Sequence, residues 1–479
     1  MRPHRPGLIQ HTFLPADPMP EDAVGSLWEA AAALGMDQPI GRWPIDPPGP
    51  GRPPPARPFT VLAGRQRHQP GALHQAILYR LDDVLGVSVL LAPNDDRIGW
   101  DRLDGRLPAP PDGAIGTVAI RTALLALPRP WLRPALIARR LGVHPDWAGA
   151  WCRTDGGVLT WELPSGTWTR RHLLAVTGIR NEPAMDEWTW AGDRSGLPPL
   201  TRYLLHAAKL RYQRQVLESS MPSLRRAIVR ADEGFRVLDQ LLSTGEPPLA
   251  QLLAADRALT TAQADQSGLI TALGDVRDMA RTVHIADRNM TAALAGHVPG
   301  APAGPPALDR EHATWLREQL RAEETYLESA HHRTREISRL AAAVIDQRQR
   351  QRQENLTLLQ TSALGALLMA LAAIQSLTYR IPLPGPLFAP VIAFLAAIAL
   401  LLPSALLRWP GGPNATRRRW PVPAGAALLG VTAGWLSGTV GWILATGHGA
   451  PPTWSAIYSA ATGVVFAAVA LAGGRRAAA

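Results

Sequence analysis

The sequence predicts an α+β N-terminal domain, a long α-helical bundle with a stalk, and a four-helix transmembrane domain. Three observations predict this organisation. Short strand-like runs fill the first part of the chain, a stretch without Pro or Gly separates Asp309 from Gly365, and long uncharged segments follow Glu354. We therefore divide the chain into residues 1–197, 198–298, 299–307, 308–355 and 356–479.

The region 1–197 mixes two hydrophobic periodicities. Strand-like runs occur at Leu8–Leu14, Phe59–Ala63, Gly86–Leu91 and Gly116–Ile120. Helix-like spacing occurs at Ala23–Leu34, Gly71–Leu85 and Trp131–Arg140. Both kinds of pattern within one cytoplasmic region are typical of an α+β domain.

The segment 198–298 predicts long helices. Leu200–Leu242 and Leu249–Leu294 carry apolar residues at helical spacing, and Gly245 and Pro247 lie between them. Because proline lacks the N–H donor that a helix interior uses, we expect Pro222 to break or kink the first helix. With the stalk, these helices predict an antiparallel bundle.

Residues 299–307 form a Pro/Gly linker, and residues 308–355 form a predicted stalk helix that continues into the membrane. Asp309 suits the N-cap of this helix. Apolar or small residues recur at sevenfold spacing, one row through Leu316, Ala330, Ile337 and Val344 and another through Leu320, Leu327 and Ala341. Such spacing predicts a coiled-coil seam, whose partners are either upstream helices of this chain or further copies of it.

Four apolar segments in residues 356–479 are each about 20 residues long, as a bilayer-crossing helix requires. They cover residues 356–377, 387–407, 424–446 and 453–473. Basic residues flank them alternately: Arg348, Arg350 and Arg352 before the first, Arg417, Arg418 and Arg419 between the second and third, and Arg475 and Arg476 after the fourth. The positive-inside rule then predicts a multi-pass protein of the cell membrane with both termini in the cytoplasm.

Small residues recur every four positions in the last two spans. They are Gly430, Gly434 and Gly438 in the third span, and Ser455, Ser459, Gly463 and Ala467 in the fourth. Such stripes let helix backbones approach closely, either within a hairpin of one chain or between copies in a homo-oligomer. The spans contain no ionisable side chain, which argues against a proton-coupled pump.

The composition offers little for chemistry. The net charge of +10 is almost all arginine, since Lys209 is the single lysine, and we interpret it as coding bias rather than nucleic-acid binding. The single cysteine, Cys152, excludes an internal disulfide and a multi-cysteine metal site. The pairs Asp82–Asp83 and Asp95–Asp96 fit turns better than catalysis. We expect no catalytic residue, cofactor or metal site.

The order of cytoplasmic α+β domain, long helices and membrane-entering stalk resembles the CorA-type divalent-cation channels. In that family a Gly-Met-Asn signature closes the first pore helix and forms the selectivity entrance. The matching place here, Ser376 to Pro382, lacks it, and four spans are predicted instead of two. These departures argue against ion conduction.

Five sequence blocks resemble the bacterial CATRA conflict-system proteins, which are named for association with caspase-like peptidases and TPR-repeat proteins. The blocks are Leu8–Phe13, Tyr79–Val84, Leu90–Pro93, Gly99 with Trp100, and Tyr203–Tyr212. The similarity is expected to cover most of the cytoplasmic part and the first membrane hairpin. It implies a membrane component of a defence system that works beside a caspase-like protease, and it carries over no catalytic residue.

We therefore expect a non-enzymatic membrane effector or scaffold of a bacterial conflict system. Its partners would be the lipid bilayer, a caspase-like peptidase or a TPR-repeat protein, and further copies of itself. The main alternative is an oligomeric cation channel of degenerate CorA-like form. A third hypothesis, an enzyme, would have to use Cys152 or the aspartate pairs.

Overall fold

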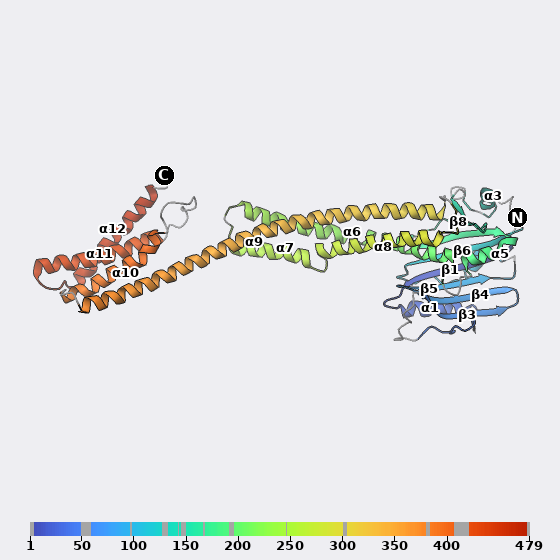
Figure 1. Ribbon diagram of the computed structural model, residues 1–479, viewed down its shortest axis with the longest axis horizontal. Coiled ribbons are helices and arrows are strands. Elements are labelled where there is room, and N and C mark those ends of the chain that lie inside the picture. The colour runs from blue at the N-terminus through green and yellow to red at the C-terminus, as the bar shows by residue number, and fades with distance from the viewer. Residues whose placement is uncertain are drawn as a thin grey trace. The chain divides into compact units, whose positions relative to one another are not determined.

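The computed structural model divides the chain into two compact units, Met1–Arg339 and Leu340–Ala479. The residues that it describes are 4–48, 59–95, 98–126, 133–141, 143–144, 150–165, 168–190, 196–245, 247–299, 304–379, 384–406 and 421–476. The first unit contains a mixed β-sheet with flanking helices and a bundle of long helices (Figure 1). The expected sheet-containing N-terminal domain and long helices are thus confirmed.

The sheet of the first unit has nine strands among the described residues, in the order β2-β3-β4-β5-β1-β6-β9-β8-β7. The strands are β1 His4–Pro15, β2 Gln38–Pro39, β3 Phe59–Gln69, β4 Ala72–Leu81, β5 Val84–Ala92, β6 Gly116–Leu125, β7 Trp151–Arg153, β8 Leu159–Leu163 and β9 Arg170–Gly178. β1 pairs antiparallel with β5 and β6, while β6 and β9 run parallel. The first strand of the chain therefore holds the middle of the sheet.

Side chains that alternate along these strands cover two different faces. On one face, Leu8, Leu78 and Val87 pack with α1 (Glu21–Ala33), and α2 (Trp100–Asp104) adds to the same apolar cluster. Near β8 and β9, this side of the sheet is covered by α3 (Pro134–Arg140). On the opposite face, Ile9 and Phe13 pack against α5 (Glu182–Thr189), which follows the short turn η2 (Ile179–Asn181), and against the start of α6.

Four helices form the bundle: α6 (Pro199–Ser243), α7 (Leu249–Ala264), α8 (Leu269–Leu294) and α9 (Pro305–Tyr379). Of the heptad rows of α9, Leu316, Leu320, Leu327 and Ala330 are buried in one apolar cluster with residues of α6 and α8. Ion pairs join the same helices at their surface: Arg277 with Glu324 at 2.7 Å, Arg317 with Asp287 at 3.2 Å, and Arg333 with Asp232 at 2.9 Å. The seam is thus covered by upstream helices of this chain, one of the two partners left open above.

Three local predictions differ from the structure. Gly71–Leu85 is not a helix, because Ala72–Leu81 is β4 and pairs on both sides with β3 and β5. Of the two effects expected of Pro222, a break is excluded, because Pro222 lies inside the continuous helix α6. The predicted helix Leu249–Leu294 is two helices, separated by a turn at residues 265–268.

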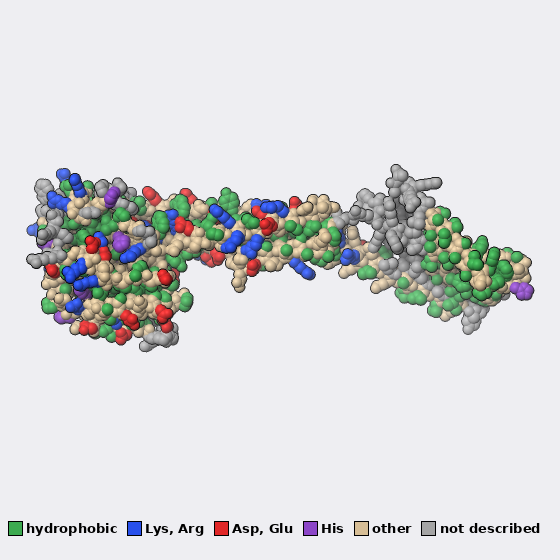
Figure 2. Space-filling model, turned by 180° about the vertical axis from the view of Figure 1, so that it is seen from behind, with side chains coloured by type: hydrophobic (Ala, Val, Ile, Leu, Met, Phe, Trp, Pro, Cys, Tyr) green, Lys and Arg blue, Asp and Glu red, His purple; other side chains and the backbone are tan. Residues whose placement is uncertain are grey.

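The second unit contains the helices α10 (Phe388–Leu406), α11 (Pro421–Thr446) and α12 (Pro452–Arg476), with the short turn η3 (Gly385–Leu387) before α10. Within the described residues, two helices are long and apolar enough to cross a membrane, Gly425–Thr446 and Pro452–Ala470. Four spans were predicted. Of the other two, 356–377 lies on α9, and 387–407 overlaps α10 but ends at residue 407, outside the described residues; both include side chains outside the described set. Figure 2 shows hydrophobic side chains dominating the described surface of α11 and α12.

Candidate functional site where the sheet meets the bundle

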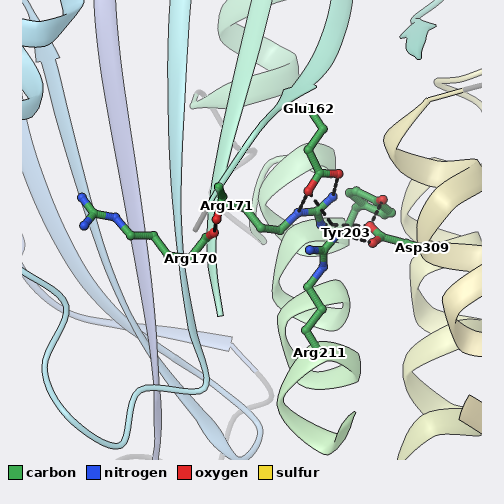
Figure 3. Close-up of polar contacts among 7 residues, drawn as sticks. Glu162, Arg170, Arg171, Tyr203, Arg211 and Asp309 are labelled. Carbon is green, nitrogen blue, oxygen red and sulfur yellow. Dashed lines mark hydrogen bonds and ion pairs between the residues drawn. The ribbon is translucent and has the colours of Figure 1, made fainter. Parts of the chain in front are cut away.

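Five polar side chains form a buried ion network between the sheet and two helices of the bundle (Figure 3). Its members come from four elements: Glu162 from β8, Arg171 from β9, Tyr203 and Arg211 from α6, and Asp309 from α9. Side chains alternate along β9, so Arg171 faces the helices while Arg170 points to the other side of the sheet (Figure 3).

Arg171 is the centre of the network. Its Nε and Nη2 donate to the two oxygens of Glu162 at 3.0 and 2.6 Å, and its Nη1 donates to Asp309 Oδ2 at 2.9 Å. Arg211 Nη2 donates to Asp309 Oδ1 at 2.9 Å and to Glu162 Oε1 at 3.1 Å. The Tyr203 hydroxyl completes the set by donating to Asp309 Oδ2. Two guanidinium groups therefore balance two carboxylates.

Burial sets the electrostatics of this network. Burial alone would lower the pKa of Arg171, but Asp309 and Glu162 raise it well above its usual value. Burial likewise opposes ionisation of Asp309, yet Arg171 and Arg211 outweigh it, and the pKa of Asp309 is lowered. Burial, followed by the charge of Asp309, raises the pKa of Tyr203. Arg171 and Asp309 are thus held in their charged forms, and removal of either one would leave a buried charge uncompensated.

Aromatic side chains flank this network at the surface. The Arg214 guanidinium lies 3.9 Å from the ring centre of Trp168 and 4.8 Å from that of Trp315, as in cation–π contacts. His312 lies beside both rings, and burial, with help from Arg211 and Arg214, lowers its pKa to about 4. These aromatic contacts therefore join α6 and α9 to the segment before β9 at a second place, beside the ion network.

A cavity of about 310 Å³ lies on the same face of the sheet, beside the N-terminus of α6. Strands β1, β3, β4 and β5 contribute to its lining, together with Ile40 and Trp43 and with residues next to the end of α5 and the start of α6. One of these residues is Trp190, whose Nε1 donates to Gln75 Oε1 at 2.9 Å. The Trp-containing segment Glu187–Trp190 thus serves two purposes, since Trp188 is buried in the core while Trp190 lines the cavity.

A chain of hydrogen bonds runs through the cavity wall. Thr201 Oγ1 lies 3.3 Å from His11 Nε2, and the Thr201 hydroxyl also approaches the Thr189 carbonyl. On the other side of the ring, His11 Nδ1 lies 2.7 Å from the Ser88 hydroxyl oxygen. A serine on a histidine resembles a nucleophile with its base, but burial lowers the pKa of His11 to about 3, which makes it a weak base. The arrangement suits binding better than covalent catalysis.

The residues weighed for catalysis lie elsewhere. Asp82 and Asp83 occupy the β4–β5 turn, where Asp82 has φ of +50° and Asp83 pairs with Lys209 at 2.5 Å. Burial raises the pKa of the Cys152 thiol to about 12, so the thiolate is scarce at neutral pH. Asp96 lies outside the described residues. In the described residues, no group of three His, Cys, Asp or Glu side chains could hold a metal ion.

The small residues of the last two predicted spans meet each other within one chain. Gly430, Gly434 and Gly438 are buried, and a Cβ atom at each would overlap Phe466, Thr462 and Tyr458 respectively. On α12, Ser459 and Gly463 are buried, while Ser455 and Ala467 are half-buried. Thr462 Oγ1 donates to the Gly430 carbonyl at 3.0 Å, which ties α12 to α11 directly.

The arginines used for topology are less completely described. Arg348, Arg350 and Arg352 lie on α9, where Arg350 pairs with Asp346 at 2.5 Å. Arg475 and Arg476 end α12, and their side chains lie outside the described set. Arg417, Arg418 and Arg419 also lie outside the described residues.

The sequence signals for this site were incomplete. The network residues stand far apart in the chain, and Asp309 was assigned to an N-cap although it lies within α9 and accepts from Arg171 and Arg211. Three of the five sequence blocks that resemble the CATRA proteins nevertheless contribute residues to the ion network or to the neighbouring cavity. They contribute His11 and Tyr79 to the cavity, and Tyr203 and Arg211 to the network.

The fold and site define a class of protein in which a sheet domain is fixed by buried charges to a bundle of long helices. Two family descriptions match this chain: the CASPASE and TPR Repeat-Associated N-terminal domain over residues 7–193, and the corresponding C-terminal domain over residues 198–334. Together they cover more than half of the sequence, and the chain belongs to this CATRA family. We expected the similarity to include the first predicted membrane hairpin. The match ends at residue 334, before that hairpin, so this expectation is wrong.

Other comparisons add less. No curated protein matches the sequence. Among solved structures, the complete structure of the CorA magnesium transporter from Methanocaldococcus jannaschii aligns over 67% of this chain and 95% of that chain, with 10% identity and a TM-score of 0.26. At this score and identity the likeness establishes neither a shared fold nor a shared function.

Proposed function

We propose that this chain is a non-enzymatic membrane effector or scaffold of a bacterial conflict system, acting with a caspase-like peptidase. The N-terminal sheet domain would receive a signal or partner, and α9 would carry the resulting change toward the apolar helices. Membership of a family named for its association with caspase and TPR-repeat proteins supports the choice of partner.

The buried ion network is the observation that carries this proposal. Asp309 lies near the start of α9 and contacts both β9 and α6 through charged groups. The same helix continues past Arg339, where the first unit ends, to Tyr379. A displacement of β9 would therefore act directly on a helix whose other end belongs to the second unit.

We also propose four membrane spans with both termini in the cytoplasm. The two apolar helices α11 and α12 support a membrane location. The arginine-rich segments and the nearly neutral loops between them support the orientation. Self-association of the membrane part remains part of the proposal, as does the absence of a nucleic-acid partner.

A liposome experiment tests the effector hypothesis. The full chain is reconstituted into dye-loaded vesicles, and a caspase-like peptidase encoded beside its gene is added. We expect the peptidase to bind and to change dye leakage. Asp309→Asn should keep binding but reduce the partner-dependent leakage, whereas Asp346→Asn, at an exposed ion pair of the same helix, should behave as the parent chain does.

Absence of both binding and partner-dependent leakage would refute the proposal. Metal-dependent flux without any partner would instead favour the oligomeric cation channel. Reconstitution with magnesium on one side only, with the peptidase omitted, separates these two outcomes.

A further inference from the structure

Positive charge is concentrated in the second unit of the chain. Leu340–Ala479 contains ten arginines and no lysine, but only two acidic residues, Asp346 and Glu354, so its formal net charge is +8. The first unit, Met1–Arg339, accounts for the remaining +2 of the total of +10. Codon usage explains arginine in place of lysine throughout the chain, but it does not explain the loss of acidic residues after Glu354. The second unit therefore offers an excess of cations to a negatively charged partner.

Three of these arginines, Arg348, Arg350 and Arg352, form an arginine collar on α9 directly before its apolar segment. At 100° per residue, Arg348 and Arg352 lie on one side of the helix and Arg350 on the opposite side. Arg350 pairs with Asp346 at 2.5 Å, yet 71% of its side chain remains exposed. An exposed pair of this kind is weak, so Arg350 can exchange its partner for another anion. The collar thus presents guanidinium groups around the helix, one turn before Leu356.

The closed end of the α11–α12 hairpin carries aromatic rings instead of charge. The ring centres of Trp442 and Trp454 lie 5.5 Å apart, and those of Trp454 and Tyr458 lie 6.4 Å apart. Residues 447–451, which connect the two helices, contain no Asp, Glu, Lys or Arg. Indole and phenol rings favour the interface between membrane and water. The hairpin therefore has an aromatic, uncharged end, whereas α12 finishes at the other end with Arg475 and Arg476.

The collar and the aromatic end are one bilayer apart. A Cβ atom at Gly449 would lie 2.9 Å from Pro386 Cγ, so η3 lies at the aromatic end of the hairpin. The helix α9 ends at Tyr379, six residues before η3 begins. From Arg352 to Tyr379 the helix rises about 40 Å at 1.5 Å per residue, which matches a bilayer with its headgroups. With Tyr379 at the aromatic interface, the collar lies among the headgroups of the opposite leaflet.

We propose that the arginine collar binds the phosphate groups of anionic phospholipids in the cytoplasmic leaflet, with phosphatidylglycerol as the simplest case. Guanidinium groups suit this partner because they donate paired hydrogen bonds to phosphate oxygens. Basic side chains beside a membrane helix also gain from the negative potential of an anionic leaflet. This inference rests on the membrane location and orientation proposed above, and it names the headgroup class that the bilayer supplies to this protein.

Energy transfer measures which lipid gathers at the collar. The full chain with Gln351→Cys carries a donor dye and is reconstituted in vesicles of phosphatidylcholine mixed with phosphatidylglycerol. A trace of either lipid carries an acceptor on an acyl chain, so that its headgroup is unchanged. Transfer to labelled phosphatidylglycerol should exceed transfer to labelled phosphatidylcholine by about threefold. A donor on His448→Cys, exposed at the aromatic end, should show no such preference. Equal transfer to both lipids at position 351, or the same preference at both positions, would overturn the proposal.

Variants of the collar test its charge. The combined change Arg348→Gln, Arg350→Gln and Arg352→Gln should reduce the preference for phosphatidylglycerol to about half or less, because fewer cations face the headgroups. Lysine at the same three positions keeps the charge and should keep most of the preference. An undiminished preference in the glutamine variant would overturn the proposal.

A matched control removes three arginines elsewhere. Arg257→Gln, Arg281→Gln and Arg288→Gln, at exposed positions of α7 and α8, lower the net charge of the chain by the same amount. This control should retain the full preference at position 351. A loss equal to that of the collar variant would show that the lipid responds to net charge alone, and it would overturn the proposal.

Membrane insertion separates failure of this inference from failure of the proposed function. Every variant is also reconstituted in vesicles of phosphatidylcholine alone and extracted with alkaline carbonate. Release of the parent chain by carbonate would refute the membrane location itself. Retention of the parent chain, together with equal transfer to the two lipids at position 351, would overturn only the anionic-lipid proposal.

Discussion

Asp309 of α9 accepts a hydrogen bond from Arg171 of β9 at 2.9 Å, although 138 positions separate the two residues in the chain. Both side chains are only 1% exposed. The pair joins the N-terminal sheet domain to α9. This helix begins within the matched C-terminal domain, residues 198–334, and continues past its end to Tyr379.

The first prediction concerns this pair. Asp309→Ala should lower the free energy of unfolding by about 3–5 kcal/mol, because it leaves Arg171 and Arg211 buried beside a single carboxylate. Asp346→Ala, which breaks an exposed i,i+4 pair, should cost about 0.3–0.5 kcal/mol. Chemical unfolding of the full chain followed by tryptophan fluorescence measures both. Equal losses in the two variants would show that the network contributes no more than a surface pair.

The second prediction concerns pH. Burial lowers the pKa of His11 from 6.5 to about 3, so below pH 6.5 the unfolded chain takes up a proton that the folded chain does not. The stability due to neutral His11 is complete above pH 6.5 and decreases as the pH falls toward 3, by up to about 1.4 kcal/mol per pH unit. His11→Gln should reduce the change in the free energy of unfolding per pH unit between pH 7 and pH 5.

Unfolding midpoints at several pH values measure the slope. Burial also lowers the pKa of His206 and of His312 to about 4, so part of the slope should persist in the variant. His68→Gln, at an exposed position, serves as the control and should retain the slope of the parent chain. A slope that is the same in His11→Gln would contradict the prediction.

The third prediction concerns the glycine face of α11. A Cβ atom at Gly434 would overlap Thr462, so Gly434→Leu should separate α11 from α12. Cysteines at positions 431 and 463 report the separation, because a Cβ at Gly463 would lie 2.5 Å from Val431 Cγ2. We expect this pair to cross-link in the parent chain and to lose most of its cross-linking with Gly434→Leu. Gly441→Leu, where a Cβ meets nothing within 4 Å, should have no such effect.

The fourth prediction concerns membrane topology. If four spans cross the bilayer and both termini are cytoplasmic, cysteines introduced as Arg380→Cys and Gly449→Cys should react with an impermeant reagent from outside. A cysteine appended after Ala479 should react only in inverted vesicles. Native background is low because the single cysteine, Cys152, is buried. Labelling of position 449 but not of position 380 from outside would show that only the last hairpin crosses.

Features with a local periodic signal could be predicted from the sequence. The strand at Leu8–Leu14 and the seam residues Leu316, Leu320 and Leu327 follow from the spacing of apolar side chains, and the structure places them in a sheet and a bundle. Gly71–Leu85 was assigned to a helix because its apolar residues also fit helical spacing. Pairing with β3 and β5, the strands directly before and after this segment in the chain, decides in favour of a strand.

The site could not be predicted in the same way. Glu162, Arg171 and Arg211 form no catalytic or metal-binding motif in the sequence, and charged residues usually face solvent. Their burial becomes evident only when β8, β9, α6 and α9 are brought together. The cavity likewise depends on His11, Tyr79 and Thr201, which lie on three separate elements.

The contact between α11 and α12 limits how copies of this protein could associate in a bilayer. Because Gly430, Gly434 and Gly438 already face α12, they are unavailable to a neighbouring molecule. The sides left over carry bulky branched groups such as Leu444, Ile457 and Val464. Lateral assembly through this hairpin would therefore rest on side chains that lipid tails solvate equally well, and its extent would vary with the lipid-to-protein ratio.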